Sequence, residues 1–115
     1  MASGFQLIVF PVSDAARGKA LFQTLLGVEP YVDQPYYVGF RVGDQEIGLD
    51  PNGHKQGQTG PIGYHDVEDI HKAVAALVDA GAEVQRQPGD VGGGKLIAWV
   101  RDPDGNVIGL AQSPA

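Results

Sequence analysis

Apolar and polar positions along the chain follow first the two-residue period of a strand and then the longer period of a helix. In the first half, the run FQLIVFPV at residues 5–12 is short, apolar and rich in β-branched residues, which predicts a strand. A helix is expected from Asp14, a candidate N-cap, to about Leu26, with Gly27 after its last turn. Two further strands are predicted at residues 36–43 and 45–50, joined by a Gly43-Asp44 hairpin turn.

The second half repeats these patterns in the same order. Residues 61–67 predict a strand, Asp69 is a candidate N-cap, and Gly81 is expected to end the helix. Three strands are then predicted at residues 82–87, 95–101 and 106–112. The segment DPDG at residues 102–105 suits a type I turn, because proline presets φ at the second position and glycine accepts the left-handed conformation.

Overlaying the halves aligns several short segments. Residues 12–14 match residues 67–69, Gly27 matches Gly81, and the Ile-Gly-Leu triplet at residues 47–49 matches a second one at 108–110. We therefore predict an α+β fold of two tandem β-α-β-β-β modules. The modules are expected at about residues 4–51 and 60–112, with a polar linker at about 52–59 that we expect to be mobile. Together they form one domain over residues 4–112, as the length of 115 residues suggests.

Composition narrows the possible partners and compartment. The 14 acidic residues exceed the 8 lysines and arginines, giving a net charge of −6, so nucleic acid is a poor candidate partner. This charge either serves solubility or attracts a cationic ligand. No apolar run is long enough to cross a membrane, and we expect no secretory leader. With no cysteine the chain has no disulfide, and a cytoplasmic location fits best.

Three segments carry a resemblance to a known family. They are VSDAARGKALFQTLLGVEP (residues 12–30), VEDIHKAVAALVDAGAEV (67–84) and GGGKLIAWVRDPDGNVIGL (92–110). They resemble the vicinal oxygen chelate superfamily of glyoxalases, bleomycin-resistance proteins and extradiol dioxygenases, over residues 4–112. The resemblance implies curved mixed sheets with helices outside and a cavity within. It also implies a homodimer, whose cavities form where units from different chains meet.

Metal-dependent members of this superfamily bind a divalent ion through His, Gln or Glu on the first and last strand of each module. The corresponding positions here are Leu7 and Gly48 in the first module, and Ile62 and Gly109 in the second. None of these side chains has a donor atom for a metal. A shifted alignment would offer Gln6, one residue away, or Glu46, two positions along, but a shift of one residue turns the side chain to the other face of the strand. The resemblance therefore implies a metal-free variant without a cofactor.

The expected cavity face follows from strand alternation. If Leu7 and Ile62 face the cavity, so do Phe5, Val9 and Tyr64, while Glu46 and Asp50 flank Gly48. The strands that the family uses as cavity wall carry most of the aromatic residues, namely Tyr31, Tyr36, Tyr37, Phe40, Tyr64 and Trp99. Such rings either stack on a flat ligand, hold a cation or pack in the core. The predicted ligand-binding residues are Leu7, Val9, Tyr37, Glu46, Gly48, Asp50, Ile62, Tyr64, Trp99 and Gly109.

A glycine inside a strand marks a bend, a bulge or a close approach. Gly48 and Gly109 therefore either make room for a ligand or relieve crowding in a curved sheet. The spacing of His54, His65 and His71 fits no metal motif, and no nucleophile with a base can be assembled, so no catalytic residue is assigned.

The leading hypothesis is a metal-free protein that binds a small organic molecule, such as a drug or metabolite. Glu46 and Asp50 are the acidic partners that it offers to a basic group. The alternative is an isomerase, lyase or dioxygenase of the same superfamily, acting without metal or with a metal held by residues aligned differently. A non-catalytic partner subunit is the third possibility.

Overall fold

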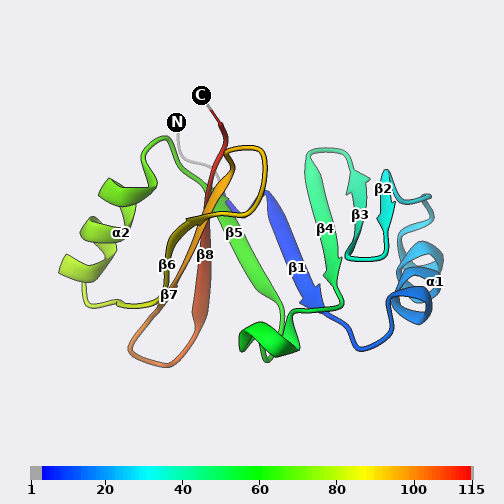
Figure 1. The fold of residues 1–115 in the computed structure, drawn as a ribbon, viewed down its shortest axis with the longest axis horizontal. Coiled ribbons are helices and arrows are strands. Elements are labelled where there is room, and N and C mark those ends of the chain that lie inside the picture. Colours follow the sequence, from blue (N-terminus) through cyan, green and yellow to red (C-terminus); the bar gives the residue numbers. More distant parts are fainter. Residues whose placement is uncertain (1–3, 115) are drawn as a thin grey trace. The chain divides into compact units, whose positions relative to one another are not determined.

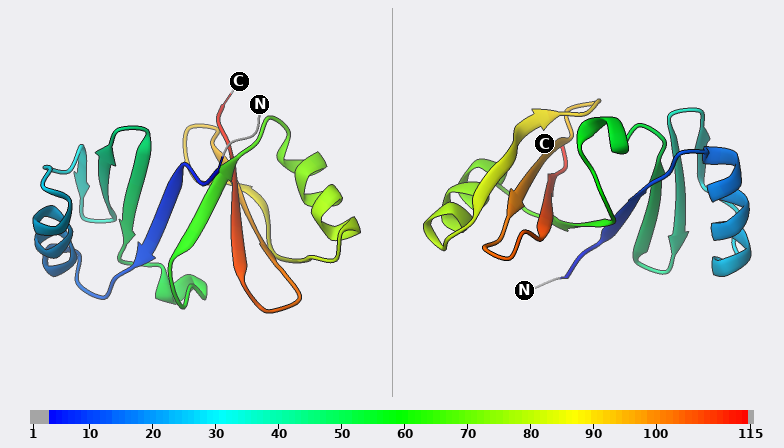
Figure 2. Two further views of the ribbon diagram at one scale, coloured as in Figure 1. Left: turned by 180° about the vertical axis from the view of Figure 1, so that it is seen from behind. Right: turned by 90° about the horizontal axis from the view of Figure 1, so that it is seen from below.

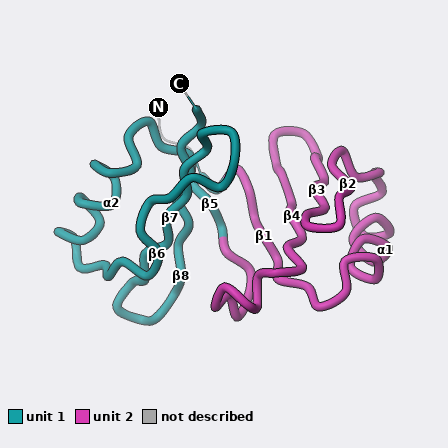
Figure 3. The backbone as a smooth tube through the Cα atoms, viewed as in Figure 1, with its two compact units in different colours: residues 1–5, 63–115 teal, residues 6–62 magenta. Residues whose placement is uncertain are grey.

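The computed structural model describes residues 4–114, which contain eight strands, two α-helices and one short 3₁₀ turn (Figure 1). In chain order the elements are β1 (Leu7–Pro11), α1 (Ala15–Leu26), β2 (Val32–Gln34), β3 (Tyr37–Val42), β4 (Gln45–Asp50), η1 (His54–Gln56), β5 (Ile62–Asp66), α2 (Ile70–Asp79), β6 (Glu83–Asp90), β7 (Leu96–Arg101) and β8 (Val107–Gln112). The predicted α+β class is confirmed. The chain forms two compact units (Figure 3): an N-terminal unit of residues 6–62, and a C-terminal unit of residues 63–114 with residues 4 and 5.

The N-terminal unit consists of four strands in the order β2-β3-β4-β1 and helix α1. β1 runs parallel to β4, and the other neighbouring pairs are antiparallel. Helix α1 lies along one side of these strands (Figure 2). Val38, Phe40 and Leu49 are buried on that side, where they pack with Phe10 and Phe22 among other apolar residues. Because side chains alternate along a strand, the residues between these positions face the opposite side of the sheet.

The C-terminal unit has the same plan, with strand order β5-β8-β7-β6 and helix α2. β5 is parallel to β8, and β7 is antiparallel to both β8 and β6. The core between α2 and the sheet contains Ile70, Val74, Ala98, Val100 and Leu110. Alternation therefore places Tyr64, Trp99 and Gly109 on the face that α2 does not cover.

The predicted helix caps and turns are present. The Asp14 side chain accepts a hydrogen bond from the Arg17 amide at 3.0 Å, and Gly27 follows α1 with a φ of 72°. Asp69 caps α2 in the same way, accepting from the Lys72 amide at 3.2 Å. In the predicted type I turn, the Gly105 amide donates to the Asp102 carbonyl at 3.0 Å. These contacts satisfy backbone groups that would otherwise be unpaired at element ends.

Three features differ from the sequence-based expectations. Strand β2 was not predicted, because its three residues show no hydrophobic alternation. Strand β6 runs to Asp90, beyond the predicted end at residue 87, with register shifts along its pairing to β7. The placement of Phe5 on the face of Tyr64 is wrong. β1 begins only at Leu7, and the Phe5 ring lies against Gly63, whose position alternates with that of Tyr64.

The linker is anchored rather than a simple mobile loop. Gln58 is 3 % exposed, and its Nε2 donates to the Val9 carbonyl at 2.8 Å and to the Gly60 carbonyl at 3.0 Å. These bonds fix the linker to the first strand of its own unit, whereas His54 remains exposed. Over residues 4–114, neither helix has the length and apolar character needed to span a bilayer.

Candidate functional site

The face of the N-terminal sheet opposite α1 brings six of the ten predicted ligand-binding residues together. The strand register aligns Leu7 of β1 with Glu46 of β4, and Glu46 with Arg41 of β3. The next row of the same face consists of Val9, Gly48 and Gly39. Asp50 follows Gly48 on β4, and Tyr37 precedes Gly39 on β3. The row that contains Glu46 and Arg41 is therefore charged, and the neighbouring row, with its two glycines, has very little side-chain volume.

Tyrosine rings cover both glycines of that second row. A Cβ atom built on Gly48 would lie 2.6 Å from Cζ and 2.9 Å from Cε1 of Tyr37. A Cβ atom on Gly39 would lie 3.2 Å from Cε1 of Tyr31. Neither glycine has a positive φ, so the backbone does not require glycine there. A Cβ atom at Gly48 would require the Tyr37 ring to move, whereas one at Gly39 would require only a small shift of Tyr31. The space over Gly48 is therefore filled by a phenol of the same unit.

Tyr31, Arg41 and Glu46 form a polar cluster at the end of this face. The Tyr31 hydroxyl donates a hydrogen bond to Oε1 of Glu46, and Nη2 of Arg41 lies 3.4 Å from the same oxygen. The guanidinium carbon of Arg41 is 4.3 Å from the centroid of the Tyr31 ring, which is a cation–π contact. Partial burial, followed by the hydrogen bond and charge of Glu46, raises the pKa of Tyr31, so this phenol holds its proton more tightly than usual.

In the C-terminal unit, packed aromatic rings cover the corresponding face of the sheet, which lies opposite α2. Tyr64 and Gly109 are paired across β5 and β8, and a Cβ atom on Gly109 would lie 2.5 Å from Cδ1 of Tyr64. The Trp99 indole N–H donates to the Tyr64 hydroxyl at 2.7 Å, and both side chains are buried. The Arg86 guanidinium lies 5.3 Å from the Trp99 ring. A ligand would have to displace packed rings to reach this glycine.

The predicted residues thus divide into two groups by accessibility. Leu7, Tyr37, Glu46 and Asp50 are half-buried and present surface on the N-terminal unit. The others are buried, namely Val9, Gly48, Ile62, Tyr64, Trp99 and Gly109. Of the aromatic residues expected at the cavity wall, Phe40 lies instead in the core beneath α1. Arg41 was not predicted as a site residue, although its place opposite Glu46 follows from the hairpin register around the Gly43-Asp44 turn.

The residues at the four positions where the superfamily holds its metal do not fit an ion. Leu7, Gly48, Ile62 and Gly109 have no side-chain donor atoms, and the Tyr37 and Tyr64 rings occupy the space that a longer side chain would need over each glycine. In the described part of the chain, no group of three or more His, Asp or Glu side chains is arranged to bind a metal ion. These four positions therefore offer a metal ion no side-chain ligand.

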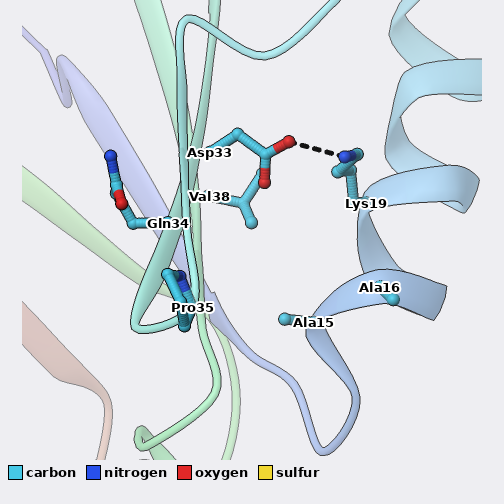
Figure 4. Close-up of a pocket in the computed structure, with 7 residues that line it drawn as sticks. All are labelled: Ala15, Ala16, Lys19, Asp33, Gln34, Pro35 and Val38. Atoms are coloured by element: carbon cyan, nitrogen blue, oxygen red, sulfur yellow. Dashed lines mark hydrogen bonds and ion pairs between the residues drawn. The ribbon is translucent and has the colours of Figure 1, made fainter.

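A pocket of about 390 Å³ lies elsewhere in the N-terminal unit, between the start of α1 and β2 (Figure 4). It is lined by Ala15, Ala16, Lys19, Asp33, Gln34, Pro35 and Val38. Lys19 and Asp33 form an ion pair of 2.5 Å across one side of the pocket. None of the predicted ligand-binding residues lines it.

Comparison with known proteins agrees with this architecture. A segment of 46 residues is 48 % identical to the putative lactoylglutathione lyase of Brassica oleracea var. gemmifera, covering 39 % of this chain and 16 % of that protein. The chain thus matches about a sixth of the length of that relative. A superfamily member from Vibrio splendidus 12B01 has a TM-score of 0.69 at 16 % identity, over 96 % of this chain and 100 % of that one. Methylmalonyl-CoA epimerase of Mycobacterium tuberculosis has the same TM-score and identity, over 100 % and 93 %.

The structural similarities, at these identities, establish the fold alone. The family model for the Glyoxalase/Bleomycin resistance protein/Dioxygenase superfamily matches residues 4–110, which is nearly the whole chain. The paired β-α-β-β-β units agree with that match. This chain therefore belongs to the glyoxalase/bleomycin resistance protein/dioxygenase superfamily.

Proposed function

We propose that the protein binds a small organic molecule, a drug or metabolite, without a metal ion. The site is the face of the N-terminal sheet opposite α1. The observation that carries this proposal is the row of Val9, Gly48 and Gly39. Tyrosine rings lie over both glycines, and the half-buried Glu46 and Asp50 border the row. Such a face offers flat apolar surface for stacking with a few polar groups to orient a ligand, which is the usual composition of small-molecule sites.

Leu7 and Tyr37 supply the apolar contact, and Glu46 and Asp50 supply acceptors. The proposal includes four residues only because they are the positions of the second module that correspond to this face, namely Ile62, Tyr64, Trp99 and Gly109. These residues are buried, so we propose a supporting role for them. The lack of metal donors at the four superfamily positions supports binding over metal-dependent catalysis.

Equilibrium dialysis against a panel of flat drugs and metabolites tests this function. We expect at least one compound to bind with micromolar affinity, and Tyr37→Ala to weaken that binding at least tenfold. Leu21→Ala, on the exposed side of α1, is the matched control and should leave affinity unchanged. Absence of any binder at micromolar concentration, or equal affinity of Tyr37→Ala, would contradict the proposal.

A metal-independent lyase or isomerase is the second candidate. It is supported by the partial sequence match to a putative lactoylglutathione lyase, over 46 residues. In this candidate Glu46, which accepts a hydrogen bond from the phenol of Tyr31, is the carboxylate that would accept a proton from a substrate on this face. Turnover that persists in EDTA and is lost in Glu46→Gln would favour this candidate. One tightly bound metal ion per site, after purification without chelators, would argue against both.

The proposal also includes a cytoplasmic homodimer, on the basis of the superfamily resemblance and the absence of cysteine. Light scattering at micromolar protein concentration is expected to give twice the chain mass. A mass of one chain would remove the dimer from the proposal and leave the ligand face of the N-terminal unit intact.

A further inference from the structure

The Tyr31 ring and the Glu46 carboxylate both contact one cation, the guanidinium of Arg41, and we call these two groups the cage. The guanidinium carbon lies 4.3 Å from the ring centroid, and a guanidinium nitrogen lies 3.4 Å from the carboxylate oxygen. An aromatic face combined with a carboxylate attracts an organic cation through the ring quadrupole and the negative charge at once. The occupant here is a side chain of the same unit, so the structure displays how the cage holds a guanidinium.

Contacts other than those with Arg41 also position the two groups of the cage. The Tyr31 amide donates to the Gly39 carbonyl at 2.9 Å, and its ring lies close against Gly39. The hydroxyl of Tyr31 in turn orients the Glu46 carboxylate, whose strand is paired on both sides. The two walls are thus positioned by the backbone and by each other.

Arg41, in contrast, is held weakly. Its side chain is 56 % exposed, and its contact of 3.4 Å with Glu46 is long for a charged hydrogen bond. Exposed ion pairs and exposed cation–π contacts each contribute little to stability. A ligand that carries its own cation can therefore take the place of this side chain at low cost.

We propose that Tyr31 and Glu46 bind the cationic group of a flat organic ligand, such as an amidinium, a guanidinium or a quaternary ammonium. The guanidinium of Arg41, which belongs to the same unit, competes with the cationic group of the ligand for this site. This inference rests on the proposed function, because it names the chemical class of the ligand of the same face. The charge of −6, and Asp50 on the same strand face as Glu46, favour a cation over an anion.

The competing arrangement is an anion bound directly by the exposed guanidinium of Arg41. The two arrangements predict opposite effects of one substitution. If Arg41 competes with the ligand, Arg41→Ala tightens the binding of a cation. If Arg41 is itself the recognition group, Arg41→Ala abolishes the binding of an anion.

The experiment uses three isosteric probes, benzamidinium, benzamide and benzoate, titrated into the full chain by calorimetry and by amide chemical shifts. We expect benzamidinium to bind best, with shifts centred on Tyr31 and Glu46. Arg41→Ala should tighten its affinity about fivefold, since it removes one weak ion pair and one exposed cation–π contact. Glu46→Gln should weaken it about tenfold, since a charged acceptor is lost. Arg17→Ala removes the same charge from the exposed side of α1 and should have no effect.

The inference is overturned if Arg41→Ala weakens benzamidinium binding, if benzoate binds better than benzamidinium, or if none of the three probes binds to the wild type or to Arg41→Ala. If benzamide binds as tightly as benzamidinium and Tyr37→Ala abolishes both, the cation class fails while the proposed ligand face stands. Backbone spectra of each variant establish that the unit remains folded, and Arg41→Ala, at an exposed position, provides the test even if Glu46→Gln does not fold.

Discussion

The ring of Tyr37 lies across Gly48, so close that a Cβ atom on this glycine would be 2.6 Å from Cζ of the phenol. The C-terminal unit repeats the arrangement with Tyr64 over Gly109. The two Ile-Gly-Leu triplets of the sequence therefore share a physical cause. Each glycine provides a flat stretch of backbone on which a tyrosine from a neighbouring strand packs. An aromatic ring in this position also compensates for the side chain that the glycine lacks.

Gly48→Ala is expected to destabilise the protein by about 1–3 kcal/mol, the usual cost of overpacking a well-filled site. The added methyl group collides with Tyr37, and the φ of Gly48 is compatible with alanine, so we ascribe the destabilisation to the ring contact. Urea denaturation measures the loss. In a Tyr37→Ala background the same substitution should cost less than half as much.

Gly60→Ala is the control for this prediction, because nothing lies within 4 Å of a Cβ atom built there and its φ is not positive. Equal destabilisation by Gly60→Ala, or an undiminished effect of Gly48→Ala when Tyr37 is absent, would show that the ring contact is not the cause.

Tyr64→Phe is expected to destabilise the protein by about 1–2 kcal/mol, because the buried indole N–H of Trp99 loses its acceptor. The fluorescence of Trp99, the single tryptophan, reports on the same change directly. Tyr36→Phe removes a hydroxyl from an exposed tyrosine and should be neutral. A Tyr64→Phe protein as stable as Tyr36→Phe would mean that this hydrogen bond does not contribute in solution.

The helices and most strands were predictable because their signals are local. Asp14 caps the start of α1 with its side chain, and Gly27 ends the helix in the left-handed conformation. The hairpin around Gly43 requires only a two-residue turn. Strand β6 was predicted too short because Pro88 and Gly89 usually end a strand. They are tolerated here since β6 is the last strand in the order of its unit and its pairing is irregular.

The candidate site was predictable only in part, because it depends on side-chain packing between distant positions. Strand alternation correctly places Leu7, Val9, Glu46 and Gly48 on one face. The contact between Tyr31 and Glu46 joins a loop to a strand fifteen residues away, and no periodicity indicates it. The glycines suggested a close approach, but the sequence does not identify which ring approaches or that it belongs to the same unit.

Gln58→Ala is expected to destabilise the protein by about 1–3 kcal/mol, since the carbonyls of Val9 and Gly60 lose a buried donor. Hydrogen exchange of the amides in residues 53–60 should accelerate most, because this side chain attaches the linker to β1. Gln87→Ala on β6 removes the same amide from an exposed position and serves as the control. Unchanged exchange in the linker would contradict the anchoring role of Gln58.

We expect the turn that begins at Asp102 to lose stability in acid. Hydrogen bonds, led by those from the Asn106 side chain and amide, lower the pKa of Asp102 below its ordinary value. A lowered pKa in the folded state means that the stabilisation is present above the ordinary pKa and is lost as the pH falls through the folded value. Asp102→Ala should therefore lower the melting temperature at pH 7 and have little effect near pH 2. The neighbouring Asp104→Ala, which keeps the Asp102 acceptor, should not show this pH dependence.

Tyr31, on the proposed ligand face, makes a contribution to stability that is lost at alkaline pH. Its pKa is raised, so its contribution to stability is complete below the ordinary value of 10.0 and is lost as the pH rises through the folded value. The absorbance titration at 295 nm, taken as wild type minus Tyr31→Phe, isolates this phenol. Glu46→Gln should lower the pKa, because the negative charge that opposes ionisation is removed. Arg41→Ala should raise it further, because Arg41 stabilises the phenolate. A shift in the same direction for both variants would contradict the cluster geometry on which the cation site depends.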